Sequence, residues 1–293
     1  MSINRTFFLL SFFSISLVYI QTVHAEKVVT SYKTSQNLQI DGIETEGAWK
    51  NVKAVTTIDS IAQVEISIKS VYSNTTIYFL VSYLDKDESR LHRCWIWDKE
   101  KEMYIEGPTR EDIFVFKWKL DEDTKDLSIY SDESYAADIW YWKAYRTDPE
   151  GFADDKIQRL FSYPTKDSYE ITSKSGNKMY IQRQGDTGRS SYKSKIFIDY
   201  QGDMIHRYEV RQPQSSRADV RAKGVWKDGR WTIEFARALV TDNLDDINFH
   251  SLDRSYGFGV SRYEIAGRPQ ENSDQPFFGS GDITELLTLE FEK

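Results

Sequence analysis

Two pairs of adjacent acids are the residues whose type and spacing best fit a catalytic or metal-binding role. Asp154-Asp155 and Asp245-Asp246 could act as paired carboxylates in acid–base catalysis or as calcium ligands. Each pair follows a strand or turn signal, where an aspartate accepts hydrogen bonds from backbone donors, and we favour this structural interpretation. The sequence has no metal-spaced His/Cys/Asp/Glu cluster, no His-Glu-x-x-His, no Gly-x-Ser-x-Gly and no phosphate loop. We therefore predict no metal site and a protein that is not catalytic by itself.

The remaining side chains that could bind a metal or haem iron stand alone in the sequence. We expect each of these side chains to lie on the surface or to be paired with neighbouring protein groups. The residues are Met103, Met179, Met204, His92, His206 and His250. The single cysteine, Cys94, excludes an internal disulfide, and without a Cys-x-x-Cys-His motif a covalent c-type haem is excluded as well. We expect Cys94 to be a small buried residue.

The densest signal is aromatic and lies in residues 137–146, which read Ala-Asp-Ile-Trp-Tyr-Trp-Lys-Ala-Tyr-Arg. With the two-residue period of a strand, Trp140 and Trp142 share one face, and Tyr141 and Lys143 share the other. Aromatic residues favour half-buried positions in sheets, so each tryptophan taken alone predicts a core strand. We expect the lysine to pair with a carboxylate or to extend outward.

This strand continues into residues 147–155, which read Thr-Asp-Pro-Glu-Gly-Phe-Ala-Asp-Asp. Together the two stretches resemble the signature of the ethylbenzene-dehydrogenase-related haem-binding domain, W-[HY]-W-K-A followed by R-T-[DN]-P-x-G-[FY]-A-D-D. Blocks at 40–49 and 216–249 agree, so the resemblance covers most of the chain after residue 36. The family supplies gamma subunits of periplasmic molybdenum oxidoreductases that act on ethylbenzene, dimethylsulfide, chlorate, selenate or nitrite.

The resemblance implies an electron-transfer subunit that carries a non-covalent haem b between an axial Met and an axial Lys. It would dock on the catalytic and iron–sulfur subunits of an oxidoreductase and pass electrons to a soluble cytochrome. By family match, the haem-pocket positions are Tyr130, Trp140, Trp142 and Gln270. This sequence departs from the family at both axial positions, because Tyr130 stands nearest to the methionine position and the loop around Gln270 has no lysine.

Two alternatives stay open beside the haem relay. One is a haem-free paralogue that acts as a structural or assembly subunit of such a complex, by contact with its partners or by self-assembly. The other is a carbohydrate-binding module, because the block at 40–49 also resembles the family-nine carbohydrate-binding sandwich. That interpretation requires Trp140, Trp142 or Trp95 to lie exposed in a groove, where the ring can stack on a sugar.

Export is predicted from the first 25 residues. A short segment with Arg5, an apolar stretch from Phe7 to Ile20 and the small-residue site Val23-His24-Ala25 have the features of a signal peptide. We expect a periplasmic or other extracytoplasmic protein with no membrane span after cleavage. A formal net charge of -8 argues against nucleic acid and anionic membranes as partners.

Alternating apolar residues in 64–69, 77–81 and 114–120 predict strands, and Asp228-Gly229 predicts a two-residue hairpin turn. Residues 26–293 are therefore expected to form a single all-β domain, an antiparallel β-sandwich with long loop insertions and few short helices. By the resemblance it is similar to the CBM9 and DOMON sandwiches. We expect the polar segment at about 156–207 to be an insertion with a functional or docking role.

Overall fold

The computed structural model describes residues 27–263 and 281–293 of the chain. The predicted signal peptide, residues 1–25, and the predicted haem-pocket residue Gln270 lie outside the described residues. No helix in the described ranges is both long and apolar enough to cross a membrane.

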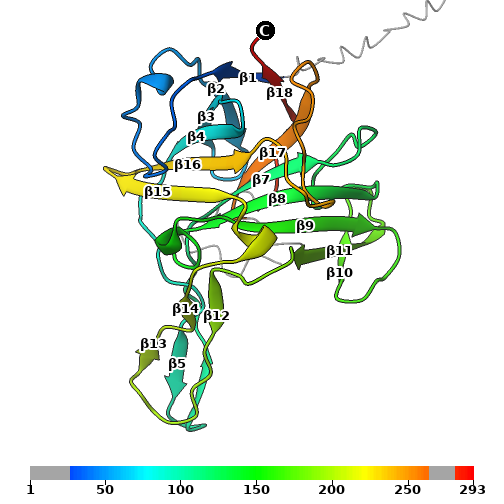
Figure 1. Cartoon of the computed structure of the whole chain (residues 1–293). Helices are drawn as coiled ribbons and strands as arrows, with labels where there is room; N and C mark the ends of the chain where they lie inside the picture. The colour runs from blue at the N-terminus through cyan, green and yellow to red at the C-terminus, as the bar shows by residue number, and fades with distance from the viewer. Residues whose placement is uncertain (1–26, 264–280) are drawn as a thin grey trace, which may run out of the picture.

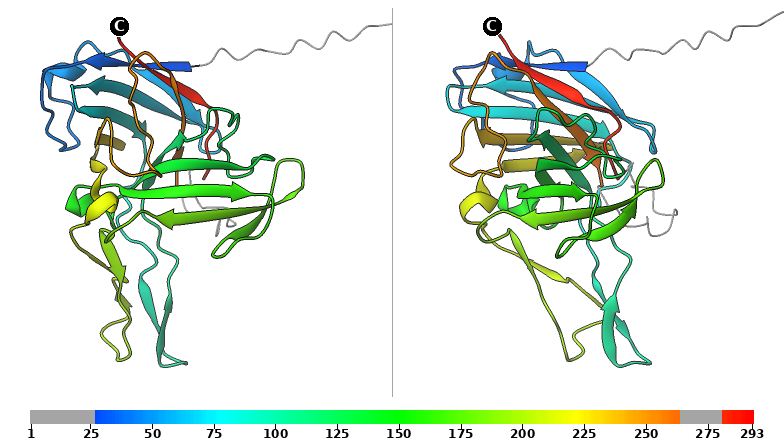
Figure 2. Two further views of the ribbon diagram at one scale, coloured as in Figure 1. Left: turned by 45° about the vertical axis from the view of Figure 1, so that its right-hand side comes forward. Right: turned by 90° about the vertical axis from the view of Figure 1, so that its right-hand side faces the viewer.

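Thirteen strands of the described chain form one sheet, which runs in the order β10-β11-β9-β8-β7-β17-β18-β1-β3-β4-β16-β15 with β2 beside β3. The sheet folds over at β17 and β18 into two facing layers (Figures 1 and 2). Pairing is antiparallel, except that β1 runs parallel to both β18 and β3. The predicted β-sandwich is confirmed. Its strands are β1 (Lys27–Lys33), β2 (Val55–Asp59), β3 (Val64–Tyr72), β4 (Thr76–Leu84), β7 (Ile113–Lys119), β8 (Tyr135–Lys143), β9 (Asp154–Phe161), β10 (Tyr169–Thr172), β11 (Lys178–Gly185), β15 (Arg221–Lys227), β16 (Arg230–Ala238), β17 (Tyr256–Arg262) and β18 (Leu287–Phe291).

Helical structure in the described ranges is limited to three single turns of 3-10 helix, as the sequence predicts. They are η1 (Gly47–Trp49), η2 (Asp148–Glu150) and η3 (Ser215–Ala218). The predicted hairpin between β15 and β16 is also confirmed, because Asp228 has φ 51° and Gly229 has φ 77°. Two successive positive φ angles are what a type I′ turn requires.

A separate arm projects from one end of the sandwich (Figures 1 and 2). It contains a two-stranded and a three-stranded sheet, built from segments about 100 residues apart in sequence. The segment 156–207 is divided between the two parts of the molecule: β9 to β11 extend the main sheet, and only its last third enters the arm. The arm strands are β5 (Trp95–Asp98), β6 (Met103–Glu106), β12 (Tyr192–Ser194), β13 (Met204–Ile205) and β14 (Tyr208–Val210).

The strands β7 and β8 are buried on both faces, which explains why they read as nearly continuous apolar runs. Their inner face, which carries Trp140 and Trp142, packs into the main core between the two layers. Their outer face, which carries Ile139 and Tyr141, packs into a second core under Leu127 and other apolar side chains. Alternation along β8 thus assigns the two sets of side chains to different cores, as the sequence pattern predicts.

Trp142 is a sharp test of the main core. Its ring is fully buried and lies 5.0 Å from that of Trp231, and Gly224 leaves no room there for a β-carbon, which would come within 2.5 Å of the ring. Replacing Trp142 with Ala should lower the free energy of unfolding by about 3–5 kcal/mol because a large cavity forms. Urea unfolding checks this. Trp95→Ala, at a half-buried ring on the arm, is the control and should lose about 1 kcal/mol. Equal losses would contradict the core assignment.

Candidate functional site

The turn between β8 and β9 is built by the polar residues of the signature. Thr147 Oγ1 accepts a hydrogen bond from the Lys143 backbone N–H at 2.9 Å and donates one to the Lys143 carbonyl at 3.2 Å. Pro149 lies in the first turn of η2, and Gly151 follows it with φ 79°, a conformation that glycine adopts without strain. This short turn brings the end of β8 beside the start of β9, and with it two charged side chains.

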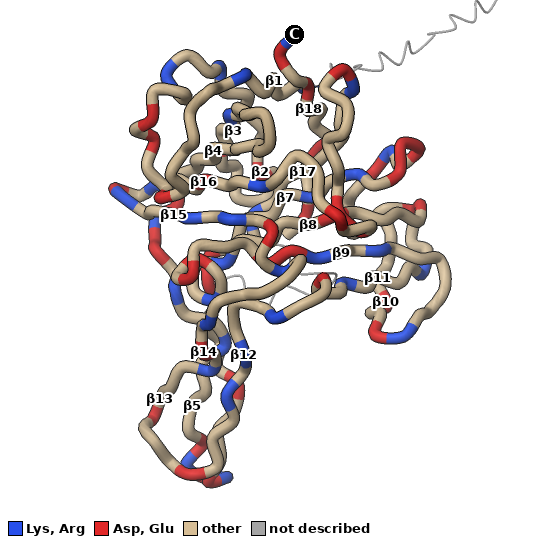
Figure 3. The backbone as a smooth tube through the Cα atoms, in the orientation of Figure 1, with Lys and Arg blue, Asp and Glu red and all other residues tan. Residues whose placement is uncertain are grey.

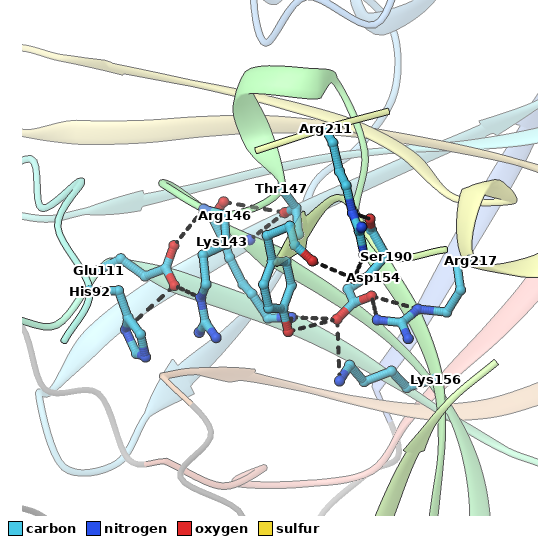
Figure 4. Close-up of polar contacts among 11 residues, drawn as sticks. His92, Glu111, Lys143, Arg146, Thr147, Asp154, Lys156, Ser190, Arg211 and Arg217 are labelled. Carbon is cyan, nitrogen blue, oxygen red and sulfur yellow. Dashed lines mark hydrogen bonds and ion pairs between the residues drawn. The ribbon is translucent and has the colours of Figure 1, made fainter. Parts of the chain in front are cut away.

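Asp154 is the centre of the site on the outer face (Figure 4). Its carboxylate contacts Lys143 Nζ at 2.6 Å and Lys156 Nζ at 3.2 Å, and it accepts a hydrogen bond from Arg217 Nε at 2.8 Å. Asp154 and Lys143 are buried. Three cations therefore share one carboxylate away from water, and the prediction that Lys143 pairs with a carboxylate is confirmed.

Burial and charge act in opposite directions on this pair. Burial alone would raise the pKa of Asp154, but Lys143, Lys156 and Arg217 outweigh it and hold that pKa well below its usual value. Burial lowers the pKa of Lys143, and Asp154 opposes that shift. The carboxylate is therefore ionised at neutral pH, and it is the fixed negative charge around which the cations gather.

A second buried carboxylate, Glu111, organises the residues after the strand. It forms an ion pair with Arg146 and accepts hydrogen bonds from the backbone N–H groups of Tyr145 at 2.7 Å and Arg146 at 2.9 Å. His92 Nδ1 lies 3.4 Å from the same carboxylate (Figure 4). Burial, reinforced by nearby arginines, lowers the pKa of His92 well below its usual value, so this histidine is neutral.

These charges also hold the base of the arm. The hydroxyl of Tyr192, on β12, lies 3.4 Å from both Lys143 Nζ and an oxygen of Asp154. The guanidinium of Arg146 lies 5.0 Å from the ring of Tyr192 and 5.2 Å from that of Tyr208, on β14. Cation–π contacts of desolvated groups are strong, so the arm is fixed to the sandwich by the same cluster. The cluster therefore holds the arm in place. Among its described residues, no nucleophile lies beside an activating base.

The predicted haem-pocket tryptophans lie on the opposite, inner face. Trp140 donates its indole N–H to Asp138 Oδ2 at 3.2 Å, and Trp142 donates to Asp148 Oδ1 at 3.0 Å. Both rings are fully buried, which removes them as exposed platforms for a sugar. Trp95 is half-buried, and Arg207 already lies over its ring at 4.5 Å. The carbohydrate-binding interpretation therefore loses the exposed stacking surface on which it depended.

The inner core leaves little room for a haem beside these rings. Phe79, Phe116, Trp118 and Phe258 surround Trp140, with centroids of neighbouring rings 4.7–6.4 Å apart. Rings at these separations are in direct contact. A haem in this protein would therefore need another location.

The outer face carries Tyr130, Met179 and Lys143, and Met179 and Lys143 lie far apart. Tyr130 is half-buried at the edge of the second core, and Met179 is buried within it. Tyr135, Leu160 and Ile181 form one row across β8, β9 and β11, and Met179 lies beyond that row. Lys143 is eight residues away along β8, roughly 26 Å. Two axial ligands must lie about 4–5 Å apart, so this pair does not fit one iron.

Sequence reasoning missed Glu111, Tyr192 and Arg217. Each is an ordinary polar residue in its local context. Glu111 and Tyr192 lie outside the matching blocks, and Arg217 lies in the block at 216–249 without a feature that sets it apart. The one available signal was the need to neutralise a lysine and an arginine in a strand of buried aromatics.

The shared carboxylate predicts unequal effects of two substitutions. Asp154→Asn should lower the free energy of unfolding by about 3–5 kcal/mol, because it leaves three cations without their counter-ion. Lys143→Met should lower it by less, because Lys156 and Arg217 still neutralise Asp154. Urea unfolding at pH 7 measures both. Lys178→Met, in an exposed pair with Glu170, is the control and should change little. A larger loss for Lys143→Met would contradict the assignment of Asp154 as the centre.

Two solved structures of a family 9 carbohydrate-binding module from Caldicellulosiruptor kristjanssonii are similar to this chain. The glucose complex has 11% identity and TM-score 0.37, covering 90% of this chain and 94% of the module. The cellotriose complex has 13% identity and TM-score 0.39, covering 91% and 95%. A search of curated proteins finds no match. The profile of the ethylbenzene dehydrogenase family matches residues 46–272, which include the whole signature hairpin, and the chain therefore belongs to that family.

Proposed function

We propose that this protein is an exported, non-catalytic accessory subunit of a molybdenum oxidoreductase complex, and that it docks on its partner subunits through the arm. Membership of the ethylbenzene dehydrogenase family supports the type of complex. The observation that carries the proposal is the apolar surface of the arm. Its location outside the cytoplasm rests on the predicted signal peptide.

The arm exposes large apolar side chains to an unusual degree. Ile196 is 85% exposed and Ile198 is 87% exposed. Four further exposed apolar residues of the arm are Met103, Ile105, Tyr200 and Met204. Single exposed apolar residues are normal on a soluble protein, but a group of this size on one projection is typical of a protein interface.

The arm is organised to present this surface. The ring of Trp97 lies 5.0 Å from that of Tyr104 and 5.2 Å from that of Tyr200, so its two segments pack against each other. Its base is fixed by the cation–π contacts of Arg146. Lys, Arg, Asp and Glu alternate along the arm without a region of one sign (Figure 3). A pre-organised apolar surface without strong net charge favours a folded protein partner.

We favour a structural or assembly role over electron transfer through haem. Contacts among the inner-core aromatics support this choice. The docking proposal stands with or without a haem, because the arm and the buried ion pairs do not depend on one.

The double variant Ile196→Asp/Ile198→Asp tests the docking surface. The tagged full chain should be purified from the organism that makes it, and its molybdenum and iron content measured. We expect the unmodified chain to carry molybdenum and iron from its partners, and the double variant to lose at least about tenfold of both, because two charges replace the apolar contact. Ile61→Asp, at an exposed isoleucine of the sandwich, is the matched control and should keep both metals.

Two results would overturn this proposal. One is that the unmodified chain purifies without molybdenum, whether as a single chain or associated only with copies of itself. The other is equal molybdenum content in all three proteins.

A further inference from the structure

A group of five aspartates lies around Arg237, where β8 and β9 meet the end of β11 and the loop after β16. Carboxylate oxygens of Asp138, Asp155 and Asp246 lie within 4.8 Å of one another, and those of Asp186, Asp245 and Asp246 do as well. Asp246 belongs to both sets. All except Asp245, which is half-buried, are at least nine-tenths buried. Segments more than 100 residues apart thus converge on one acidic centre.

Some carboxylate oxygens of this group accept hydrogen bonds from the protein, and others have no hydrogen-bond donor. Asp138 Oδ2 accepts the Ile247 N–H at 2.9 Å, Asp246 Oδ2 accepts Thr241 Oγ1–H at 2.6 Å, and Asp186 Oδ2 accepts Ser216 Oγ–H at 3.4 Å. The Oδ1 atom of each of these three aspartates has no hydrogen-bond partner.

Asp155 is the extreme case. It is fully buried, and neither of its carboxylate oxygens accepts a hydrogen bond. Its ion-pair contact with Arg237 Nε is 4.0 Å long. Buried carboxylate oxygens are ordinarily paired, and neighbouring unpartnered carboxyls are stabilised either by a shared proton or by a bound cation.

Arg237 supplies too little charge to be the counter-ion of the whole group. It contacts Asp246 at 2.6 Å and Asp138 at 3.6 Å, and it also donates to the Ile247 carbonyl at 2.6 Å. No other cation forms an ion pair with these acids in the described part of the chain.

We infer that Asp138, Asp155, Asp186, Asp245 and Asp246 form a binding site for a divalent cation, with Ca²⁺ as the best match. Ca²⁺ takes six to eight oxygen ligands at about 2.3–2.6 Å, so oxygens on opposite sides of the ion are about 4.6–5.2 Å apart. Within each set the oxygens lie within 4.8 Å of one another, close enough for one ion to contact all three acids. The all-oxygen donor set disfavours Zn²⁺, which selects imidazole and thiolate. Asp246 also lines an open surface pocket, through which an ion can enter.

A third acidic group is less buried and better paired, because Asp41 and Glu46 are only half-buried, although Glu46 Oε2 also lacks a hydrogen-bond partner. Asp41, Glu46 and Glu234 also place oxygens within 4.8 Å. Glu234, however, accepts hydrogen bonds from Trp49 Nε1 and from the backbone N–H groups of Asp41 and Gly42. Its two oxygens are both used by the protein. We therefore assign no ion to this group, and it supplies the control for the test.

Two measurements test the site on the mature protein. The first is Tb³⁺ luminescence excited through tryptophan, because Trp140 donates directly to Asp138 and lies close enough to transfer energy. Tb³⁺ should give sensitised emission that Ca²⁺ displaces. The second is thermal unfolding in EDTA and in Ca²⁺. Ca²⁺ at about 100 times its Kd should raise Tm by about 5–10 °C.

Asp186→Asn is the decisive variant, because Asp186 has no contact with Arg237 and its side chain accepts one long hydrogen bond. In EDTA this variant should melt above the unmodified protein, since it removes a buried charge that forms no ion pair among the described residues. It should also lose the Ca²⁺ shift and the Tb³⁺ emission. Glu46→Gln should keep both. The inference is overturned if Ca²⁺ leaves the Tm of the unmodified protein unchanged and Tb³⁺ gives no emission, or if Asp186→Asn keeps the full Ca²⁺ shift.

Discussion

The structure depends on one carboxylate, Asp154, that is held out of water by three cations. Transferring a charge from water to a protein interior is unfavourable by several kcal/mol, so the group is stable only with its counter-ions in place. Lys143 comes from the adjacent strand, Lys156 from the same strand and Arg217 from a distant turn. The buried carboxylate is stable only when all three cations are in place. The ion pairs therefore fix the position of the signature hairpin and, through Tyr192, the base of the arm.

The signature is therefore a folding device in this chain. Its tryptophans fill the main core and find buried acceptors in Asp138 and Asp148, while its lysine and arginine face the other way and meet Asp154 and Glu111. Strand β8 and the turn after it therefore contact both cores and the base of the arm. The resulting molecule has a rigid sandwich, an apolar arm and an acidic centre, and the proposed docking role rests on the arm.

Periodicity predicted the sandwich, because alternation in β3 and β8 and the Asp228-Gly229 turn are local signals. The ion pairs could not be predicted in the same way. Arg217 is far from Asp154 in sequence, and the register of distant strands decides their contact. For the same reason the aspartate group has no motif spacing: the turn interpretation covers Asp155, Asp245 and Asp246, and the sequence carries no signal for Asp138 or Asp186. β9 and β11 resemble a polar insertion in the sequence because they carry Lys, Arg and Gln, whose side chains are paired within the fold, as Lys156 is with Asp154 and Gln158 with Arg183.

The central claim is that this sandwich is filled by its own side chains and works by docking. The most direct test is the absorption spectrum of the mature protein, purified from cells supplied with haem and recorded before and after dithionite. We predict a spectrum without features above 300 nm that dithionite does not change. A Soret band that sharpens on reduction, with resolved α and β bands, would contradict the account and establish a haem relay.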